Sequence, residues 1–171
     1  MRSAELLLEG FNNIRGVVHA AVEGLTPDQL AFRVDDEANT IGWLVWHLTR
    51  VQDGYVAEMG GTEPVWTSLG FADRFGLPFE ASVSGYGQSP EEVGAVRVTA
   101  DDLIAYFGAV HERTVRFVKP LTDADLDRVV DRSWDPPVTL GVRLVSVTTD
   151  DLQHAGQAAF VRGLVQRRSS V

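Results

Sequence analysis

Near the C-terminal end, two carboxylates and a histidine interrupt a segment that otherwise has the pattern of an apolar helix. Asp150 and Asp151 precede His154 by four and three residues. On a helix, both spacings place the carboxylate on the same side as the imidazole. Two acids and a histidine in a core-facing stripe are hard to explain as packing. They have the pattern of half a metal site whose remaining ligand comes from another helix.

His47 is the candidate for that remaining ligand. It follows Leu44 by three residues and precedes Val51 by four, so it belongs to the inner face of a predicted helix over residues 40–59. Two imidazoles and one carboxylate leave coordination positions open, which is typical of catalytic sites for zinc, nickel or ferrous iron. Spacing alone also fits a solvated acidic face and a hydrogen-bonded core histidine, so both interpretations stay open at this point.

Composition narrows the classes of function. The chain has 171 residues, which suits one domain, and its net charge of -9 argues against nucleic acid and anionic membranes as partners. It has no cysteine, so a disulfide framework, a cysteine metal site and a cysteine nucleophile are all excluded. Any thiol chemistry would need a thiol from outside. No run of about 18 apolar residues and no signal-like N-terminus is present, so we expect a cytoplasmic protein.

Four long segments with helical periodicity would position the candidate ligands. We predict helices over residues 3–24, 40–59, 89–118 and 139–166, with Thr99 as an additional cap that would divide the third. Ser3, Thr40 and Thr139 would cap the first, second and fourth helices, and Thr26 and Thr122 would each cap a short helical turn. Strand alternation is not persuasive, and residues 131–138 are expected to form a loop or a short extended piece. The predicted fold class is all-α: a four-helix bundle in a single domain over residues 1–171. A long irregular connection, residues 62–88, would join the second and third helices and act as a lid, a binding loop or a subunit contact.

Other residues have a structural interpretation beside a functional one. We expect His19 and His111 to be surface or core-edge histidines rather than a fourth ligand or a base, and Asp53 to be a surface charge rather than a partner that orients an imidazole. Gly156 is expected to permit close helix approach. Four further residues are expected to pair with acids (Arg50 and Arg162) or to pack beside His47 (Trp43 and Trp46), and Gln157 is either a plain polar residue or a hydrogen-bond partner of a metal-bound water.

Two motifs resemble the DinB-like superfamily, and more narrowly its mycothiol-dependent maleylpyruvate isomerase-like branch from actinobacteria. They are Asn-Thr-Ile-Gly-Trp-Leu-Val-Trp-His-Leu at residues 39–48 and Asp-Asp-Leu-Gln-His-Ala-Gly-Gln-Ala-Ala-Phe-Val-Arg-Gly at residues 150–163. The resemblance implies a four-helix bundle with a divalent metal held by His47, Asp150 and His154. It favours Asp150 over Asp151 as the ligand, although many relatives carry histidine, and others glutamate, at that position.

The resemblance also implies a function. Zinc or nickel would bind the sulfur of a low-molecular-weight thiol such as mycothiol, and the enzyme would be a thiol-dependent transferase or isomerase acting on a small electrophile. Many relatives are homodimers. The alternatives are a metal-dependent hydrolase and a non-catalytic, stress-associated bundle with a degenerate metal site. Lys119 is the only lysine among 15 basic residues, which is consistent with a GC-rich, actinobacterial genome.

Overall fold

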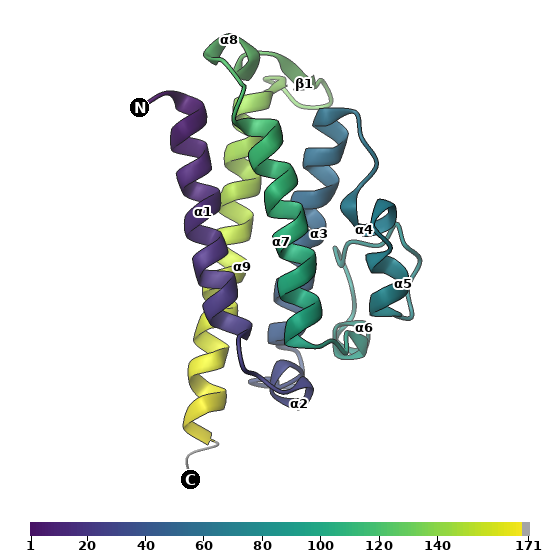
Figure 1. Cartoon of the computed structure of the whole chain (residues 1–171). Helices are drawn as coiled ribbons and strands as arrows, with labels where there is room; N and C mark the ends of the chain where they lie inside the picture. Colours follow the sequence, from purple (N-terminus) through teal and green to yellow (C-terminus); the bar gives the residue numbers. More distant parts are fainter. Residues whose placement is uncertain (169–171) are drawn as a thin grey trace.

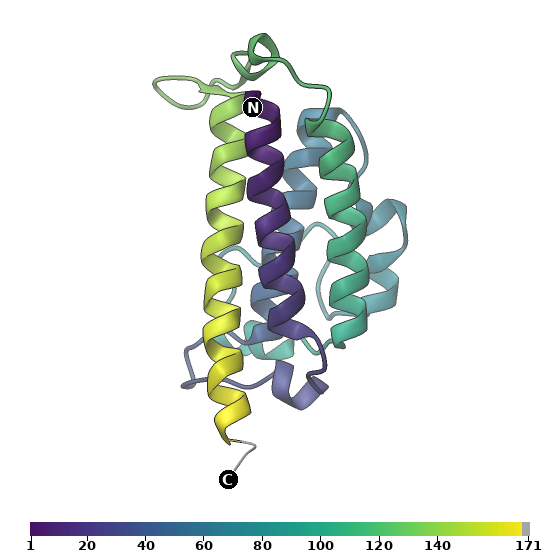
Figure 2. The same ribbon diagram turned by 60° about the vertical axis from the view of Figure 1, so that its left-hand side comes forward.

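The computed structural model describes residues 1–168, and this part of the chain is mostly helical with one small two-stranded sheet. Its four long helices are α1 (Ser3–Val22), α3 (Ile41–Gly60), α7 (Ala100–Val118) and α9 (Leu140–Arg168). They lie side by side with similar axial directions (Figure 1). Both α9 and α7 pack against α1 and α3, so α1 and α3 lie between them on opposite sides (Figure 2). The predicted helical character is confirmed.

Side-chain caps set most of the helix starts. Thr40 Oγ1 accepts a hydrogen bond from the backbone N–H of Trp43 at 3.0 Å, which begins α3 at the predicted position. Thr99 Oγ1 likewise accepts from the N–H of Asp102 at 3.1 Å, so the predicted third helix is divided into α6 (Pro90–Ala95) and α7. The first helix differs from expectation, because Arg2 rather than Ser3 is its N-cap.

The remaining regular elements are short. The helices α2 (Pro27–Leu30) and α8 (Asp123–Leu126) follow the Thr caps expected before them. The strands β1 (Val129–Asp131) and β2 (Val138–Thr139) pair antiparallel at one end of the long helices. Strands of three and two residues are too short to show an alternating pattern, which is why residues 131–138 were expected to form only a loop or a short extended piece.

The connection between α3 and α6 is more ordered than predicted. It contains α4 (Val65–Ser68) and α5 (Phe71–Phe75), and the side chains of Trp66, Phe71 and Phe75 are buried. Trp66, Phe71 and Phe75 each contact the ring of Tyr106 on α7, at centroid distances of 5.0, 5.0 and 5.8 Å. The first half of this connection is therefore part of the hydrophobic core rather than a free lid.

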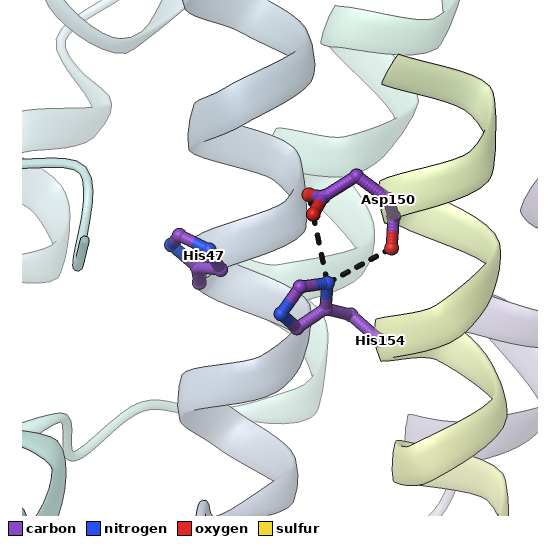
Figure 3. A group of neighbouring side chains, drawn as sticks. All are labelled: His47, Asp150 and His154. Carbon is purple, nitrogen blue, oxygen red and sulfur yellow. Dashed lines mark hydrogen bonds and ion pairs between the residues drawn. The ribbon is translucent and has the colours of Figure 1, made fainter. Parts of the chain in front are cut away.

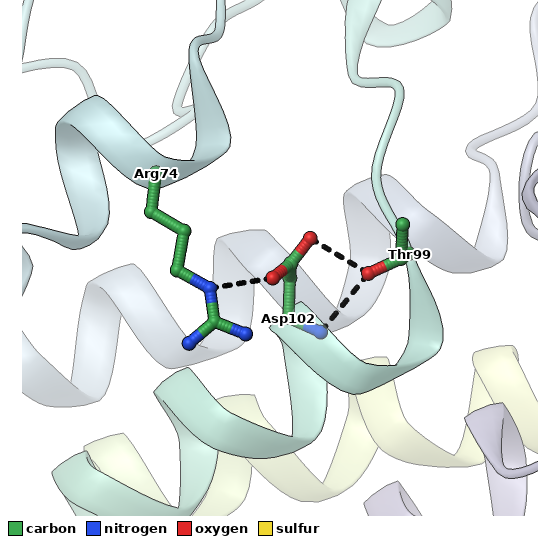
Figure 4. Close-up of polar contacts among 3 residues, drawn as sticks. All are labelled: Arg74, Thr99 and Asp102. Atoms are coloured by element: carbon green, nitrogen blue, oxygen red, sulfur yellow. Dashed lines mark hydrogen bonds and ion pairs between the residues drawn. The ribbon is translucent and has the colours of Figure 1, made fainter.

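A polar contact also holds α5 to the start of α7. Arg74 Nε donates to Asp102 Oδ1 at 2.6 Å, and Thr99 Oγ1 donates to Asp102 Oδ2 at 2.6 Å (Figure 4). The same aspartate thus completes the α7 cap and pairs with the connecting segment. The Arg74–Asp102 contact fixes the segment relative to α7, and the Thr99 contact holds Asp102 in place.

The hydrophobic core lies between the long helices and also encloses several buried polar side chains. Its largest members come from all four helices: Phe11, Ile14, Leu44, Trp46, Leu48, Leu103, Tyr106, Leu140 and Leu144. Asp151, on the inner stripe of α9, is fully buried among them. None of the described helices is both long and apolar enough to cross a membrane.

Candidate metal site

His47, Asp150 and His154 come together where α3 faces α9 (Figure 3). One ligand atom from each of the three lies within 4.8 Å of the others, the only such group found among residues 1–168. Ligand atoms about 2.0–2.2 Å from a common ion lie at most about 4.4 Å apart. A small rotation of these side chains would therefore place all three on one divalent cation.

Backbone carbonyl groups orient both imidazoles. His47 Nδ1 lies 2.6 Å from the carbonyl oxygen of Ser84, and His154 Nδ1 lies 2.8 Å from that of Asp150. A carbonyl only accepts, so each Nδ1 carries the hydrogen and donates it. Each Nε2 is then left with its lone pair for a metal, as is usual for metal-bound histidine.

The loop beside His47 contributes residues that the sequence did not reveal. Ser84 supplies the carbonyl, and Gly85 follows with a φ of 99°, in the left-handed region that favours glycine. A Cβ at Gly85 would lie 2.9 Å from His47 Nδ1 and 3.0 Å from the ring of Trp46. On the other side, Trp43 stacks on His47 with a centroid distance of 4.5 Å and an interplanar angle of 14°. The imidazole of His47 therefore lies between the Trp43 ring and the loop at Ser84 and Gly85.

Burial favours the metal-binding form of His47. Burial lowers the pKa of His47, an effect that the Ser84 carbonyl partly opposes, so the neutral imidazole is favoured. Asp150 Oδ2 is buried and accepts no hydrogen bond; His154 Nδ1 lies 3.5 Å from it. A buried carboxylate oxygen without a hydrogen-bond donor lies beside two imidazoles with free lone pairs. This set of atoms is suited to bind a cation.

The two adjacent acids have different environments. Asp151 is fully buried, neither of its oxygens accepts a hydrogen bond, and it is not part of the three-residue group. Burial, and next the charge of Asp150, raise the pKa of Asp151 well above its usual range. It is therefore a neutral core residue, whereas Asp150 lies beside the imidazoles.

A cavity adjoins the three residues. Its volume is about 570 Å³, within the range of small-molecule sites. Its lining residues come from α3, α9 and the loop beside His47: His47, Arg50, Val51, Gly54, Tyr55, Glu58, Ser84, Tyr86, Arg143, Ser146, Val147 and Asp150. A substrate in this cavity would lie against two of the three candidate ligands.

The arginines do not form the predicted ion pairs. Arg50 donates through Nη2 to the carbonyl of Ala81 at 2.8 Å and through Nε to that of Val83 at 3.2 Å. Arg162 donates to the carbonyl of Ala21 at 3.3 Å. Backbone carbonyls rather than carboxylates accept the hydrogen bonds of Arg50, because residues 81–83 form a loop beside its side chain. Helical periodicity does not predict the course of such a loop.

Three further expectations need correction or qualification. Asp53 is not a surface charge: it is 1% exposed and accepts hydrogen bonds from Val65, Trp66 and Tyr106. His111 is 4% exposed and belongs to the core, whereas His19 is half exposed beside Glu23, as expected. Gly156 permits no close approach, because a Cβ there would meet no atom within 4 Å.

Comparisons with known proteins agree with the mostly helical fold. The family model described as mycothiol-S-transferase matches residues 6–167. A crystal structure described as that of the conserved protein of a locus from Enterococcus faecalis is 27% identical, with a TM-score of 0.90. That similarity covers 96% of this chain and 98% of the other. None of the curated proteins matches the chain. Because the family model spans nearly the whole sequence, the chain belongs to the mycothiol-S-transferase family, a DinB-like family.

Proposed function

We propose that the protein is a divalent-metal-dependent S-transferase that joins a low-molecular-weight thiol of the mycothiol type to a small electrophile. The observation that carries the proposal is the group of His47, Asp150 and His154, which offers an unpaired carboxylate oxygen and two free imidazole lone pairs beside a cavity that His47 and Asp150 line. Membership of the mycothiol-S-transferase family supports the choice of thiol. We also propose that residues 1–171 form one cytoplasmic, DinB-type four-helix-bundle domain.

The residues present fit a zinc or nickel ion. When bound, such an ion would act as a Lewis acid that favours the thiolate form of an external thiol. The remaining work falls to the chain itself. The carbonyls of Ser84 and Asp150 hold the Nδ1 hydrogens, and Trp43 fixes the plane of the His47 ring, so both Nε2 atoms keep their direction while substrates exchange.

The cavity beside the ligands gives the thiol and the electrophile a common place to meet. Its wall is mixed, with the rings of Tyr55 and Tyr86, the guanidinium of Arg143 and the carboxylate of Glu58. Holding two reactants at one surface converts a bimolecular step into an effectively unimolecular one. The absence of cysteine leaves no protein thiol to compete for the metal or for the electrophile.

A metal-dependent hydrolase is the second candidate, because three protein ligands leave a position in which water could be activated. A degenerate, non-catalytic site is the third. The three readings differ in whether metal binds and in what changes when thiol is added.

The first test is metal binding. Purified protein titrated with zinc or nickel should bind roughly one equivalent, and His154→Ala should bind less than about a tenth of that, because two ligands rarely hold a metal that needs three. The matched control is His19→Ala, a half-exposed histidine on α1, which should bind like the wild type. A wild-type protein that bound no metal would remove both enzyme proposals.

The second test separates transferase from hydrolase. Cobalt-substituted protein should show a new thiolate-to-cobalt absorption band when mycothiol is added, and the band should be absent in His154→Ala. Metal binding with a spectrum that thiol leaves unchanged would reject the transferase and favour hydrolysis.

A further inference from the structure

Tyr86 lies at the rim of the cavity beside the candidate ligands. Its side chain is 92% exposed, more than that of any other aromatic residue among residues 1–168, although it lines the cavity together with His47 and Asp150. An aromatic ring that is so exposed gains almost nothing from packing within the chain. A single exposed ring is ordinary on a protein surface, so the case for Tyr86 depends on its position and on the backbone that carries it.

The backbone is attached to α3 on both sides of Tyr86. Before it, the carbonyl of Ser84 accepts the hydrogen bond from His47 Nδ1 at 2.6 Å. After it, Gln88 Oε1 accepts from Trp43 Nε1 at 2.7 Å, and the backbone N–H of Gln88 closes a tight turn around Tyr86. Trp43 and His47 are one helical turn apart, and their rings stack. The turn is therefore fixed to α3 at the point where a candidate ligand projects.

Glycines on both sides of Tyr86 determine how its ring can move. Both have a positive φ, 99° at Gly85 and 74° at Gly87, which other residues rarely adopt. Gly85 lies tightly against the His47 ring, so this side of the turn is fixed. A Cβ at Gly87 would meet no atom within 4 Å, so glycine serves the backbone there rather than a close contact. The Tyr86 ring can therefore rotate about its own side-chain bonds, with small adjustments at Gly87, and the loop as a whole stays in place.

We propose that Tyr86 determines specificity for the electrophile: its ring folds over a flat, unsaturated molecule bound in the cavity and holds that molecule beside the candidate ligands. This inference rests on the proposed function for the identity of the occupant. In the proposed transfer the thiolate sulfur bonds to an electrophilic carbon, the leaving group departs with its bonding electron pair, and the thiol proton passes to solvent. Tyr86 takes no part in these bond changes. It contributes binding energy through its ring.

The other walls of the cavity favour a flat apolar molecule. Val51 and Val147 offer apolar surface, and Tyr55 supplies a second ring. Arg143 Cζ lies 4.6 Å from the centre of the Tyr55 ring, so one face of that ring is occupied and the ring is a fixed wall. The ring of Tyr86 is the free one. Aromatic rings attract one another beyond the effect of the area that they bury, whereas a small aliphatic electrophile would gain little from such a ring.

The first measurement is binding of para-nitrotoluene, a flat ring without a leaving group, to the full chain as purified, followed by NMR of the Gly85 and Gly87 amides. The wild type should show saturable shifts below about 1 mM, the upper end of usual KM values. Tyr86→Ala should bind about tenfold more weakly because one ring contact is lost, while Tyr86→Phe, which keeps the ring, should bind like the wild type. Trp134→Ala is the matched control: an exposed aromatic residue outside the cavity, whose loss should change nothing. A wild type without saturable shifts, or Tyr86→Ala with wild-type affinity, overturns the proposal.

The second measurement separates this inference from the proposed function. Conjugation of mycothiol is followed with para-nitrobenzyl bromide and with iodoacetamide, which both react at a carbon that carries a halide but differ in the ring. The chain has no cysteine that either reagent could alkylate. Tyr86→Ala should raise KM for the first about tenfold at unchanged kcat, and leave the kinetics with iodoacetamide unchanged.

Equal losses with both electrophiles, or weaker binding of mycothiol instead of para-nitrotoluene, would overturn the role of Tyr86 and leave the transferase standing. A wild type that binds para-nitrotoluene through Tyr86 but conjugates neither electrophile would reject the transferase and keep Tyr86 as the contact for flat ligands.

Discussion

Asp53 and Asp150 both project from inner helix faces, yet their surroundings are opposite. Asp53 Oδ1 accepts from the N–H of Val65 at 2.8 Å, and Oδ2 accepts from the N–H of Trp66 at 2.8 Å and from the hydroxyl of Tyr106 at 2.9 Å. Asp150 Oδ2 accepts no hydrogen bond although it is buried. A carboxylate whose oxygens all accept hydrogen bonds has a structural role, and we call Asp53 with its three donors the Asp53 tie. A carboxylate with a free buried oxygen beside two imidazoles can still bind a ligand.

The Asp53 tie explains how the connecting segment is held. It reaches from α3 to the first turn of α4 and to α7, so one side chain joins three elements. Burial, and next the negative charge of Asp53, raise the pKa of Tyr106 well above its usual range, so the hydroxyl stays a donor. Asp150 Oδ2 accepts no such hydrogen bonds, so this carboxylate can adjust around an ion while the two imidazoles stay fixed.

The largest effect should come from breaking the tie. Asp53→Ala leaves two backbone N–H groups and a tyrosine hydroxyl buried without an acceptor, and should lower the free energy of unfolding by about 3–5 kcal/mol. Urea unfolding followed by circular dichroism measures it. Asp150→Ala is the matched comparison and, in metal-free protein, should cost less than about 1 kcal/mol because no hydrogen bond to its side chain is lost. Equal losses in the two variants would contradict the distinction between tie and site.

Asp151 gives a smaller effect of opposite sign. It is fully buried and neither oxygen has a partner. Replacing an unsatisfied buried polar group by an apolar one of similar size is neutral or stabilising. Asp151→Leu should therefore raise the free energy of unfolding of the metal-free protein by about 1–2 kcal/mol, measured by the same urea titration. A loss of stability would mean that Asp151 has a polar partner in solution and is closer in kind to Asp53.

Much of the fold was predictable because it depends on interactions between residues that are close in the sequence. Helical periodicity and the caps at Thr26, Thr40 and Thr122 located the elements, since each cap is made by residues three apart in the sequence. Asp150 and His154 belong to one helical turn, so their proximity followed from spacing alone. His47 required a further assumption, that its helix faces the last one, which rested on the inner-face position of all three residues; the family motifs then favoured Asp150 over Asp151.

The rest depends on contacts between distant segments. The carbonyl of Ser84 lies beside His47 because a loop without periodicity turns back over α3. Asp53 was expected to be a surface charge because its partners come from segments 12 and 53 residues away. A carboxylate looks the same in sequence whether its donors come from water or from a neighbouring helix, so only the packed chain distinguishes the two cases.

His111 tests whether an unpaired buried atom is enough to mark a site. Its Nδ1 has no partner, as with Asp150 Oδ2, but it is not part of a group of candidate ligands, and its ring lies near Phe107 at 6.2 Å. Burial, and next the charge of Arg15, lower its pKa. The unfolded chain therefore binds the proton more readily, and the stability associated with His111 should be complete above about pH 6.5, the usual value for histidine, and decline as the pH falls.

The effect of His111 on the free energy of unfolding should be the smallest of the three, and it should be visible as a slope of that free energy against pH. Stability of the metal-free wild type, measured by urea unfolding between about pH 5 and pH 8, should fall toward acid more steeply than that of His111→Gln. His47 contributes a slope of the same sign in both proteins, so the difference isolates His111. His19→Gln, on the surface, should keep the wild-type slope. If His111→Gln also bound metal less tightly, the residue would belong with His47, Asp150 and His154. Unchanged binding would show that a lone unsatisfied nitrogen, without converging ligands, only costs stability through its burial.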